Sequence, residues 1–268
     1  MKNLFAFLFI ATLFSCKTDK TNNELNSCKD NALAQVIYLD IFKQSQYYVS
    51  TFLNQQNPGD TAIKFVTSAN PASPTFPFTL TVVHGNSDVL CYDNKYRRGN
   101  MVIKVSAASY NNTMTSIDKM EISFSDFYLN QSNVLGKFNI VNQGLNSKNN
   151  YVFDLRAQEG IIINSNGTMS WDGIETLELT AGATTNTVFD NTYSLTGSAS
   201  GKDFKGTDFS AAISSAMTVD PNCRWFITSG KMAVEPNKLD VRNLDYGNGC
   251  TGLVSVMIKE EALSFSIQ

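Results

Sequence analysis

Few side chains in this sequence are of the types that carry out chemistry. The 268 residues include one histidine, two tryptophans and five cysteines. His84 stands in a predicted turn after a strand, and the chain has no G-x-S-x-G motif whose serine it would activate. No two cysteines have the C-x-x-C spacing of a redox or zinc motif. We therefore expect no cofactor, no metal and no nucleophilic catalysis, and we interpret His84 as a structural residue.

Two further groups of residues could act on a sugar. Trp171 falls at a predicted turn, where its ring could stack on a glycan; packing in the core is the alternative. Acidic residues could supply the paired carboxylates of a glycosidase, and the candidates are Asp172, Glu175, Glu178, Asp240 and Asp245. Acidic residues scattered over a sheet are ordinary, so the sequence favours a protein that is not an enzyme.

Cys16 follows a segment with the features of an export signal. Met1-Lys2-Asn3 is positively charged, and Leu4 to Phe14 is an apolar run too short to span a bilayer. The run ends in Leu13-Phe14-Ser15-Cys16, which resembles the lipobox of bacterial lipoproteins, whose cysteine thiol forms a thioether to a diacylglycerol. We expect residues 1–15 to be a signal peptide, Cys16 to be lipidated and residues 16–29 to be a tether. The partner would then be a membrane, reached through the lipid.

The other four cysteines are even in number, which is typical of disulfides in an exported chain. The segment that starts at Cys223 is expected to turn at Pro236-Asn237-Lys238 and to return over 239–246, which brings Cys250 back toward Cys223. We therefore favour a Cys223–Cys250 bond, worth roughly 3 kcal/mol in the chain-entropy model. A Cys28–Cys91 bond, which would tie the helix to the sheet, has less support.

Residues 30–54 have the periodicity of an amphipathic helix. Polar Gln35, Asp40, Lys43 and Gln44 fall on one side. Other side chains, many of them aromatic, recur at three- and four-residue steps on the opposite side: Ala34, Ile37, Tyr38, Ile41, Phe42, Ser45, Tyr48, Val49 and Phe52. We expect this face to pack against a sheet rather than to form a binding groove.

From residue 75 to residue 268 the period changes to two. Alternating segments such as Met101/Ile103/Val105 and Leu263/Phe265/Ile267 are separated by Gly, Asn, Asp and Ser clusters. The intervals suit hairpins and are too short for helical crossovers. The predicted fold is all-β: a large antiparallel meander, as a curved sheet, a sandwich or a barrel-like form, with the N-terminal amphipathic helix packed on it.

Two local features of the predicted sheet can be placed. Arg97-Arg98-Gly99 precedes a strand and is expected at a solvated hairpin end. Between Trp225 and Val234 the apolar residues change from odd to even numbers, which requires one extra residue, and Ser229-Gly230 is the natural place for a bulge. The segment 223–235 would then be one long bent strand; two strands joined by a tight Ser-Gly turn are the alternative.

The chain resembles a group of uncharacterised outer-membrane and surface lipoproteins of Bacteroidetes. Six motifs carry the resemblance in this order: Phe76-Pro77-Phe78-Thr79-Leu80-Thr81, Arg97-Arg98-Gly99, Thr168-Met169-Ser170-Trp171, Tyr193-Ser194-Leu195-Thr196-Gly197, Asn222-Cys223-Arg224-Trp225 and Leu244-Asp245-Tyr246-Gly247-Asn248-Gly249-Cys250. The resemblance implies a β fold and an outer-membrane location, on the periplasmic or the surface-exposed face. It implies no activity for any residue.

Charge and composition limit the functions that remain. A net charge of −3 and a pI near 5.2 lack the basic character of a nucleic-acid-binding protein. We expect a membrane-anchored extracytoplasmic lipoprotein with a non-catalytic role in binding, adhesion or envelope structure, with a glycan or an envelope protein as its partner. The alternative is a glycan-binding or glycan-active surface protein.

Overall fold

The computed structural model describes residues 22–59, 62–107, 117–185 and 187–267. Within this part of the chain it has one helix, α1 (Asn26–Leu53), and one large antiparallel sheet. The strands are β1 (Lys64–Val66), β2 (Phe78–Val83), β3 (Val89–Leu90), β4 (Tyr96–Ser106), β5 (Lys119–Leu129), β6 (Ser132–Leu145), β7 (Tyr151–Asn164), β8 (Gly167–Ala181), β9 (Thr192–Lys202), β10 (Asp208–Val219), β11 (Ile227–Pro236), β12 (Arg242–Asn248), β13 (Leu253–Ile258) and β14 (Glu261–Ser266).

The strands follow one another across the sheet in chain order. The exception is β3, which pairs with β4 alone. The main path of the sheet therefore passes directly from β2 to β4. β1 and β14 lie at the two ends of the hydrogen-bonded path, so the sheet is curved but not closed. The prediction of an antiparallel all-β meander with one N-terminal helix is confirmed.

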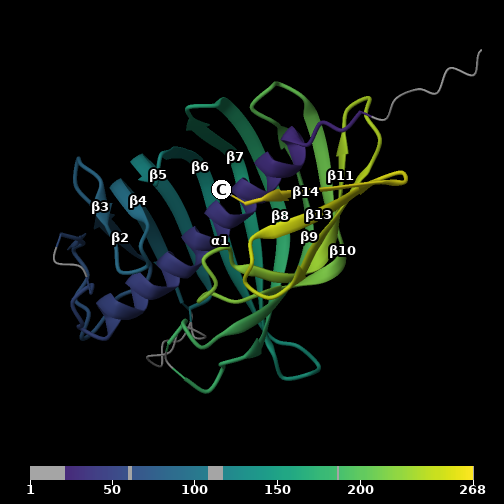
Figure 1. Ribbon diagram of the computed structural model, residues 1–268. Coiled ribbons are helices and arrows are strands. Elements are labelled where there is room, and N and C mark those ends of the chain that lie inside the picture. Colours follow the sequence, from purple (N-terminus) through teal and green to yellow (C-terminus); the bar gives the residue numbers. More distant parts are fainter. Residues whose placement is uncertain (1–21, 60–61, 108–116, 186, 268) are drawn as a thin grey trace, which may run out of the picture.

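The helix lies inside the curve of the sheet. Figure 1 shows the teal strands behind α1 and the yellow C-terminal strands in front of it. Its apolar face packs in the core as expected, but Gln35, Asp40, Lys43 and Gln44, placed on a polar side by the sequence, are also buried. Because the sheet curls round the helix, both sides of α1 meet protein, and the polar side chains find partners on the strands and on the loops between them.

The helix also begins earlier than expected. Residues 26–29, assigned to the tether, form its first turn, in which Ser27 and Cys28 are buried. Ser27 Oγ donates a 2.6 Å hydrogen bond to Asp203 Oδ2, and the guanidinium of Arg242 donates to the carbonyl oxygens of Asn22 and Glu24. These contacts to the sheet hold the chain from residue 22 onward.

A register shift is present at Gly230, but the extra residue there lies on β12 and not on β11 as predicted, because Ser229 to Lys231 stand opposite Asp245 to Asn248. The pairing of β11 with β12 shifts register between Ser229 and Lys231, and Gly230 has a φ of +114°. A Cβ added to Gly230 would lie 2.6 Å from Met217 Cα, so only glycine fits. The shift keeps Met232 in the core. The strand itself starts at Ile227 rather than at residue 223, because residues 223–226 form a tight turn.

Candidate functional site

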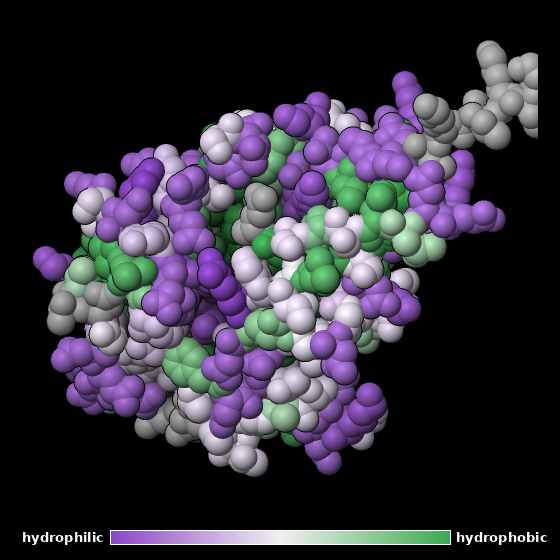
Figure 2. Space-filling view, viewed as in Figure 1, coloured by the Kyte–Doolittle hydropathy of each residue, from purple (hydrophilic) through white to green (hydrophobic). Residues whose placement is uncertain are grey.

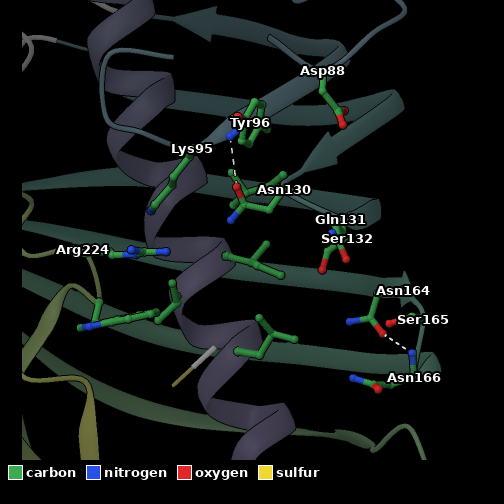
Figure 3. Close-up of a pocket in the computed structure, with 15 residues that line it drawn as sticks. Asp88, Lys95, Tyr96, Asn130, Gln131, Ser132, Asn164, Ser165, Asn166 and Arg224 are labelled. Carbon is green, nitrogen blue, oxygen red and sulfur yellow. Dashed lines mark hydrogen bonds between the residues drawn. The ribbon is translucent and has the colours of Figure 1, made fainter. Parts of the chain in front are cut away.

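A groove opens where the ends of three hairpins meet the middle of α1. Its floor is apolar and consists of Leu33, Val36 and Ile37 from the helix. We call it the polar groove and define its walls by Lys95, Tyr96, Asn130, Asn164, Asn166, Arg224 and Trp225; its volume is about 490 Å³. Figure 2 shows that this face of the molecule is mainly hydrophilic, with hydrophobic residues visible in its hollowed middle. In Figure 3 the two cations lie beside the helix and the amides lie across the groove from them.

The amide side chains of the groove come from hairpin tips. Asn130 has a φ of +54° in the two-residue turn between β5 and β6, and its Oδ1 accepts the Tyr96 N–H at 3.0 Å. Asn164 Oδ1 accepts the Asn166 N–H at 2.8 Å. Each asparagine thus uses its oxygen to hold the backbone, while its Nδ2 makes no hydrogen bond within the described part of the chain. The tips therefore present N–H donors to the groove.

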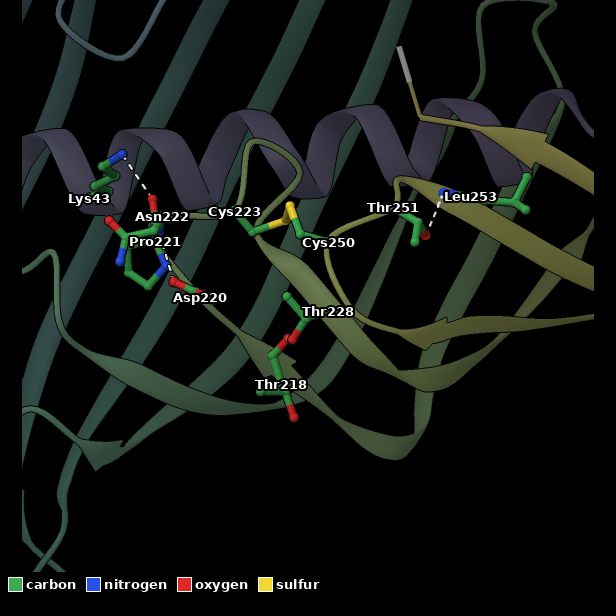
Figure 4. The surroundings of a disulfide bond; sticks show 10 residues. All are labelled: Lys43, Thr218, Asp220, Pro221, Asn222, Cys223, Thr228, Cys250, Thr251 and Leu253. Atoms are coloured by element: carbon green, nitrogen blue, oxygen red, sulfur yellow. Dashed lines mark hydrogen bonds between the residues drawn. A yellow bond between two sulfur atoms is a disulfide. The ribbon is translucent and has the colours of Figure 1, made fainter.

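A disulfide-bonded loop forms the opposite wall. Cys223 is bonded to Cys250, as predicted, and the bond holds the turn that carries Arg224 and Trp225 (Figure 4). Trp225 lies against Gly252, where an added Cβ would be 2.4 Å from Trp225 Nε1. Arg224 is exposed, and its Cζ lies 4.9 Å from the centre of the Trp225 ring. Arg224 has no acidic partner in the described ranges, so its charge is available to a ligand.

A cluster of buried charges lies behind the groove. Asp40 is completely buried and accepts hydrogen bonds from Arg97 Nη2 at 2.7 and 2.8 Å and from Lys95 Nζ at 2.8 Å. Arg97 also donates to both oxygens of Asp93. Burial alone would raise the pKa of Asp40, but Arg97 and Lys95 outweigh it and hold that pKa below its usual range. The two positive charges, on Lys95 and Arg97, are thus neutralised by the two negative charges, on Asp40 and Asp93. These ion pairs attach the β3–β4 turn to the helix.

The place of Arg97 corrects the sequence interpretation of a solvated hairpin end. Arg97 is fully buried, while Arg98 points outward to Asp88 and stacks on Tyr128. The signal was present in the sequence, because Arg97 has the same odd-numbered phase as Met101 and the other inward residues of β4. A cation in the inward phase requires a buried carboxylate, which Asp40 supplies.

Trp171 is not a glycan-stacking residue. It is 1% exposed, its ring stacks on Tyr38 with centroids 4.8 Å apart, and its Nε1 donates to Asn31 Oδ1 at 2.9 Å. The turn expected here is several residues earlier, between β7 and β8, so Trp171 falls on the inward phase of a long strand. The core alternative is correct. The tryptophan that reaches a groove is Trp225, which the sequence analysis placed beside the disulfide.

The acidic residues proposed as a glycosidase pair are dispersed. Asp172, Glu175 and Glu178 lie on β8, whereas Asp245 lies on β12, where it is in the outward phase and forms an ion pair with Lys231. On β8, Glu175 faces the core, whereas Asp172 and Glu178 share the outer face six residues, or about 20 Å, apart. The separation of Asp172 and Glu178 exceeds the roughly 5–9.5 Å of catalytic pairs, and Glu175 lies on the opposite face of the sheet from both. Asp240 forms its ion pair with Lys259 instead.

Glu175 is the one member of that set with an unusual environment. It is 5% exposed and accepts a 2.7 Å hydrogen bond from Gln35 Nε2 on the helix. Burial raises the pKa of Glu175 to about 7, and the bond from Gln35 lowers it only in part. The charge of Glu175 also contributes, after burial and Cys28, to a raised pKa of the buried Tyr246. Both side chains are buried, so neither is open to a substrate from solvent.

The two remaining cysteines do not pair with each other. Cys28 lies in the first turn of α1, whereas Cys91 lies near Tyr48, twenty residues or about 30 Å along the helix. That separation excludes the Cys28–Cys91 bond. His84 is buried at the same end, with Nε2 3.1 Å from Tyr48 Oη; burial, followed by the charge of Arg97, lowers its pKa to about 4. His84 is therefore a neutral core residue at pH 7.

The expected lipid attachment at Cys16 and the signal peptide over 1–15 lie outside the described residues. Within those residues, no helix combines the length and the apolar character needed to cross a bilayer. Comparison with protein-family models, with curated proteins and with solved structures gives no match. The interpretation of the groove accordingly rests on its own residues.

Proposed function

We propose that this protein is an outer-membrane lipoprotein, anchored through Cys16, whose extracytoplasmic domain binds a ligand in the polar groove without transforming it. The lipobox-like segment supports the anchor, and the resemblance to Bacteroidetes lipoproteins supports the location. Few residues separate Cys16 from Asn22, so an anchor at Cys16 would keep the domain close to the membrane surface. A non-catalytic role agrees with the dispersed carboxylates and with the neutral, buried state of His84.

One observation carries the binding role. Arg224 and Trp225 are held at the edge of the groove by a disulfide, and they face amide donors on rigid hairpin tips above an apolar floor. Ligand sites in proteins combine an apolar lining with a few fixed polar groups in this way. An unpaired guanidinium beside a partly exposed indole has no evident structural task, because the loop is already fixed by its disulfide and backbone bonds.

The aromatic residues of the groove favour a glycan as the ligand. Trp225 is partly exposed and Tyr96 is 45% exposed, so both rings offer flat apolar surface next to polar tips. Asn130 and Asn166 add the amide groups that hydrogen-bond to hydroxyls. A glycan-binding surface protein, which the sequence analysis kept as the alternative, is therefore the second candidate, with Trp225 in the role first assigned to Trp171.

The binding role can be tested on the full chain in detergent micelles. We expect binding to members of a glycan array, or capture of a ligand from envelope extract, that is lost in Trp225→Ala and Arg224→Gln. Asp240→Asn, which changes an exposed acid on another strand connection, is the matched control and should bind normally. Equal binding by all these variants would refute the groove as the site.

The anchor requires a separate experiment. We expect radiolabelled palmitate to enter the wild-type protein and not a Cys16→Ser variant, which should leave the membrane fraction. A Cys16→Ser protein that still sediments with membranes would contradict the anchor while leaving the binding experiment unaffected.

A further inference from the structure

A second cavity lies on the other side of Lys95 and Arg224. Its volume is also about 490 Å³, and it is enclosed by the β3–β4 turn, the segment around Phe189 and the loop that precedes β11. Three cations line it, namely Lys43, Lys95 and Arg224, together with one carboxylate, Asp93, and the rings of Tyr92, Phe189 and Phe226. We call it the cationic cavity. Its volume lies within the range of small-molecule sites.

Lys43 is the unusual member of this cavity. It is 7% exposed, and its Nζ donates one hydrogen bond, to Pro221 O at 2.9 Å. The same Nζ lies 5.4 to 5.8 Å from the ring centres of Tyr92, Phe189 and Phe226. Lys43 forms no ion pair within the described ranges. An ammonium group has three donors, so two remain for a ligand.

The neighbouring charges leave the cavity positive. Asp40 is occupied by Lys95 and Arg97, and Asp93 is occupied by Arg97. The positive charges of Lys43 and Arg224 therefore remain without a carboxylate. Burial, in spite of the attraction of Asp40 and Asp93, lowers the pKa of Lys43. A buried cation is costly to maintain, and a bound anion would offset that cost.

The backbone is also strained at this point. Phe226 has a φ of +62°, a conformation that costs a phenylalanine about 1–2 kcal/mol. In this conformation its ring lies close to two ammonium groups, with Lys95 Nζ at 4.4 Å and Lys43 Nζ at 5.7 Å from its centre. Strained residues of this kind cluster at ligand sites.

From these observations we propose that the cationic cavity binds a small carboxylate attached to a six-membered ring. The carboxylate would be held by Lys43 and Arg224 through charge-assisted hydrogen bonds. The ring would pack against Tyr92 and Phe189, which form the apolar wall. An aromatic acid and an acidic sugar share this chemistry. The inference goes beyond binding in the polar groove, although the two sites share Lys95 and Arg224.

The test measures the binding of two acids and of their neutral counterparts by calorimetry on the full chain in detergent micelles. Benzoate is compared with benzamide, and glucuronate with glucose. We expect at least one acid to bind at least tenfold more tightly than its counterpart, and the preference to weaken at high salt. Binding of benzoate alone identifies an aromatic acid and binding of glucuronate alone an acidic sugar. Absence of a preference for either acid would overturn the proposal.

Variants separate this cavity from the polar groove. Lys43→Met and Arg224→Gln should each weaken binding of the acid about tenfold or more. Lys231→Met, which removes an exposed lysine paired with Asp245, should leave it unchanged. Asn166→Ala alters only the polar groove and should also leave it unchanged. Because Arg224 is exposed, its variant tests the proposal even if Lys43→Met fails to fold. Acid binding that survives both cavity variants would refute the assignment.

Discussion

Replacement of Asp40 by asparagine tests whether the buried charges hold the sheet to the helix. Asp40 is fully buried and accepts three hydrogen bonds, two from Arg97 and one from Lys95. An asparagine retains the shape but removes the charge, so Arg97 keeps only Asp93 and Lys95 loses its carboxylate partner. Breaking one member of a buried pair costs about 3–5 kcal/mol, because the partner charge stays buried. We expect Asp40→Asn to lower the free energy of unfolding by about 4 kcal/mol.

The assay is urea unfolding of the full chain in detergent micelles at pH 7, with Lys231→Met as control. The control breaks the exposed Lys231–Asp245 pair and should cost at most about 1 kcal/mol. The pKa of Asp40 is lowered in the folded state, so its contribution is present above about pH 4 and is lost as the pH falls further. The difference between wild type and Asp40→Asn should therefore shrink below pH 4. A loss below 1 kcal/mol at pH 7 would refute the reasoning.

Three further predictions concern single features. The pKa of Glu175 is about 7 in the folded state and about 4.3 when unfolded, so its protonated form stabilises the fold below pH 4 and this contribution is lost as the pH rises through 7. Urea unfolding of Glu175→Gln at pH 8 should show a gain of up to about 3 kcal/mol over wild type, and no gain would contradict the burial argument. Reduction should lower the unfolding free energy by roughly 3–4 kcal/mol in wild type and not in a Cys223→Ser, Cys250→Ser double variant, since the bond closes a loop with a separation of 27 residues. Iodide should quench the fluorescence of Trp171→Phe, which retains the partly exposed Trp225, more strongly than that of Trp225→Phe, which retains the buried Trp171. Equal quenching of the two variants would place Trp225 in the core.

The features that the sequence predicts correctly are those set by neighbours along the chain. Alternation with period two determines which side of a strand is apolar, so it predicts the antiparallel meander. A change of phase cannot be accommodated in a regular ladder, so it predicts the shift of register at Gly230, although not that the extra residue there lies on β12. The pairing of Cys223 with Cys250 follows from the same hairpin, because β11 and β12 are consecutive.

The features that the sequence analysis places wrongly depend on how far the sheet curls. A helix on an open sheet exposes its polar side, and on that assumption Asp40 and Lys43 were assigned to the side away from the core. The β3–β4 turn and the loop that precedes β11 cover that side, so the same residues become buried charges. The error for Trp171 has a related cause. Strand β8 is long and includes the Gly and Ser residues that were interpreted as a turn, so Trp171 lies within a strand and points into the core. Neither strand length nor curvature is encoded in a local periodicity.

The buried ion pairs also determine which cations are available to bind an anionic ligand. Lys95 lines both cavities, but its ammonium is already bound to Asp40, so a ligand that attracted it would weaken the contact between the β3–β4 turn and the helix. Within the part of the chain that the structure describes, Arg224 and Lys43 have no carboxylate partner that would compete with a ligand. Affinity for an anion should therefore come mainly from these two residues. Lys95 would add a long-range electrostatic attraction while it stays bound to Asp40. It follows that loss of Lys95 should affect stability more than binding, and loss of Arg224 should affect binding more than stability.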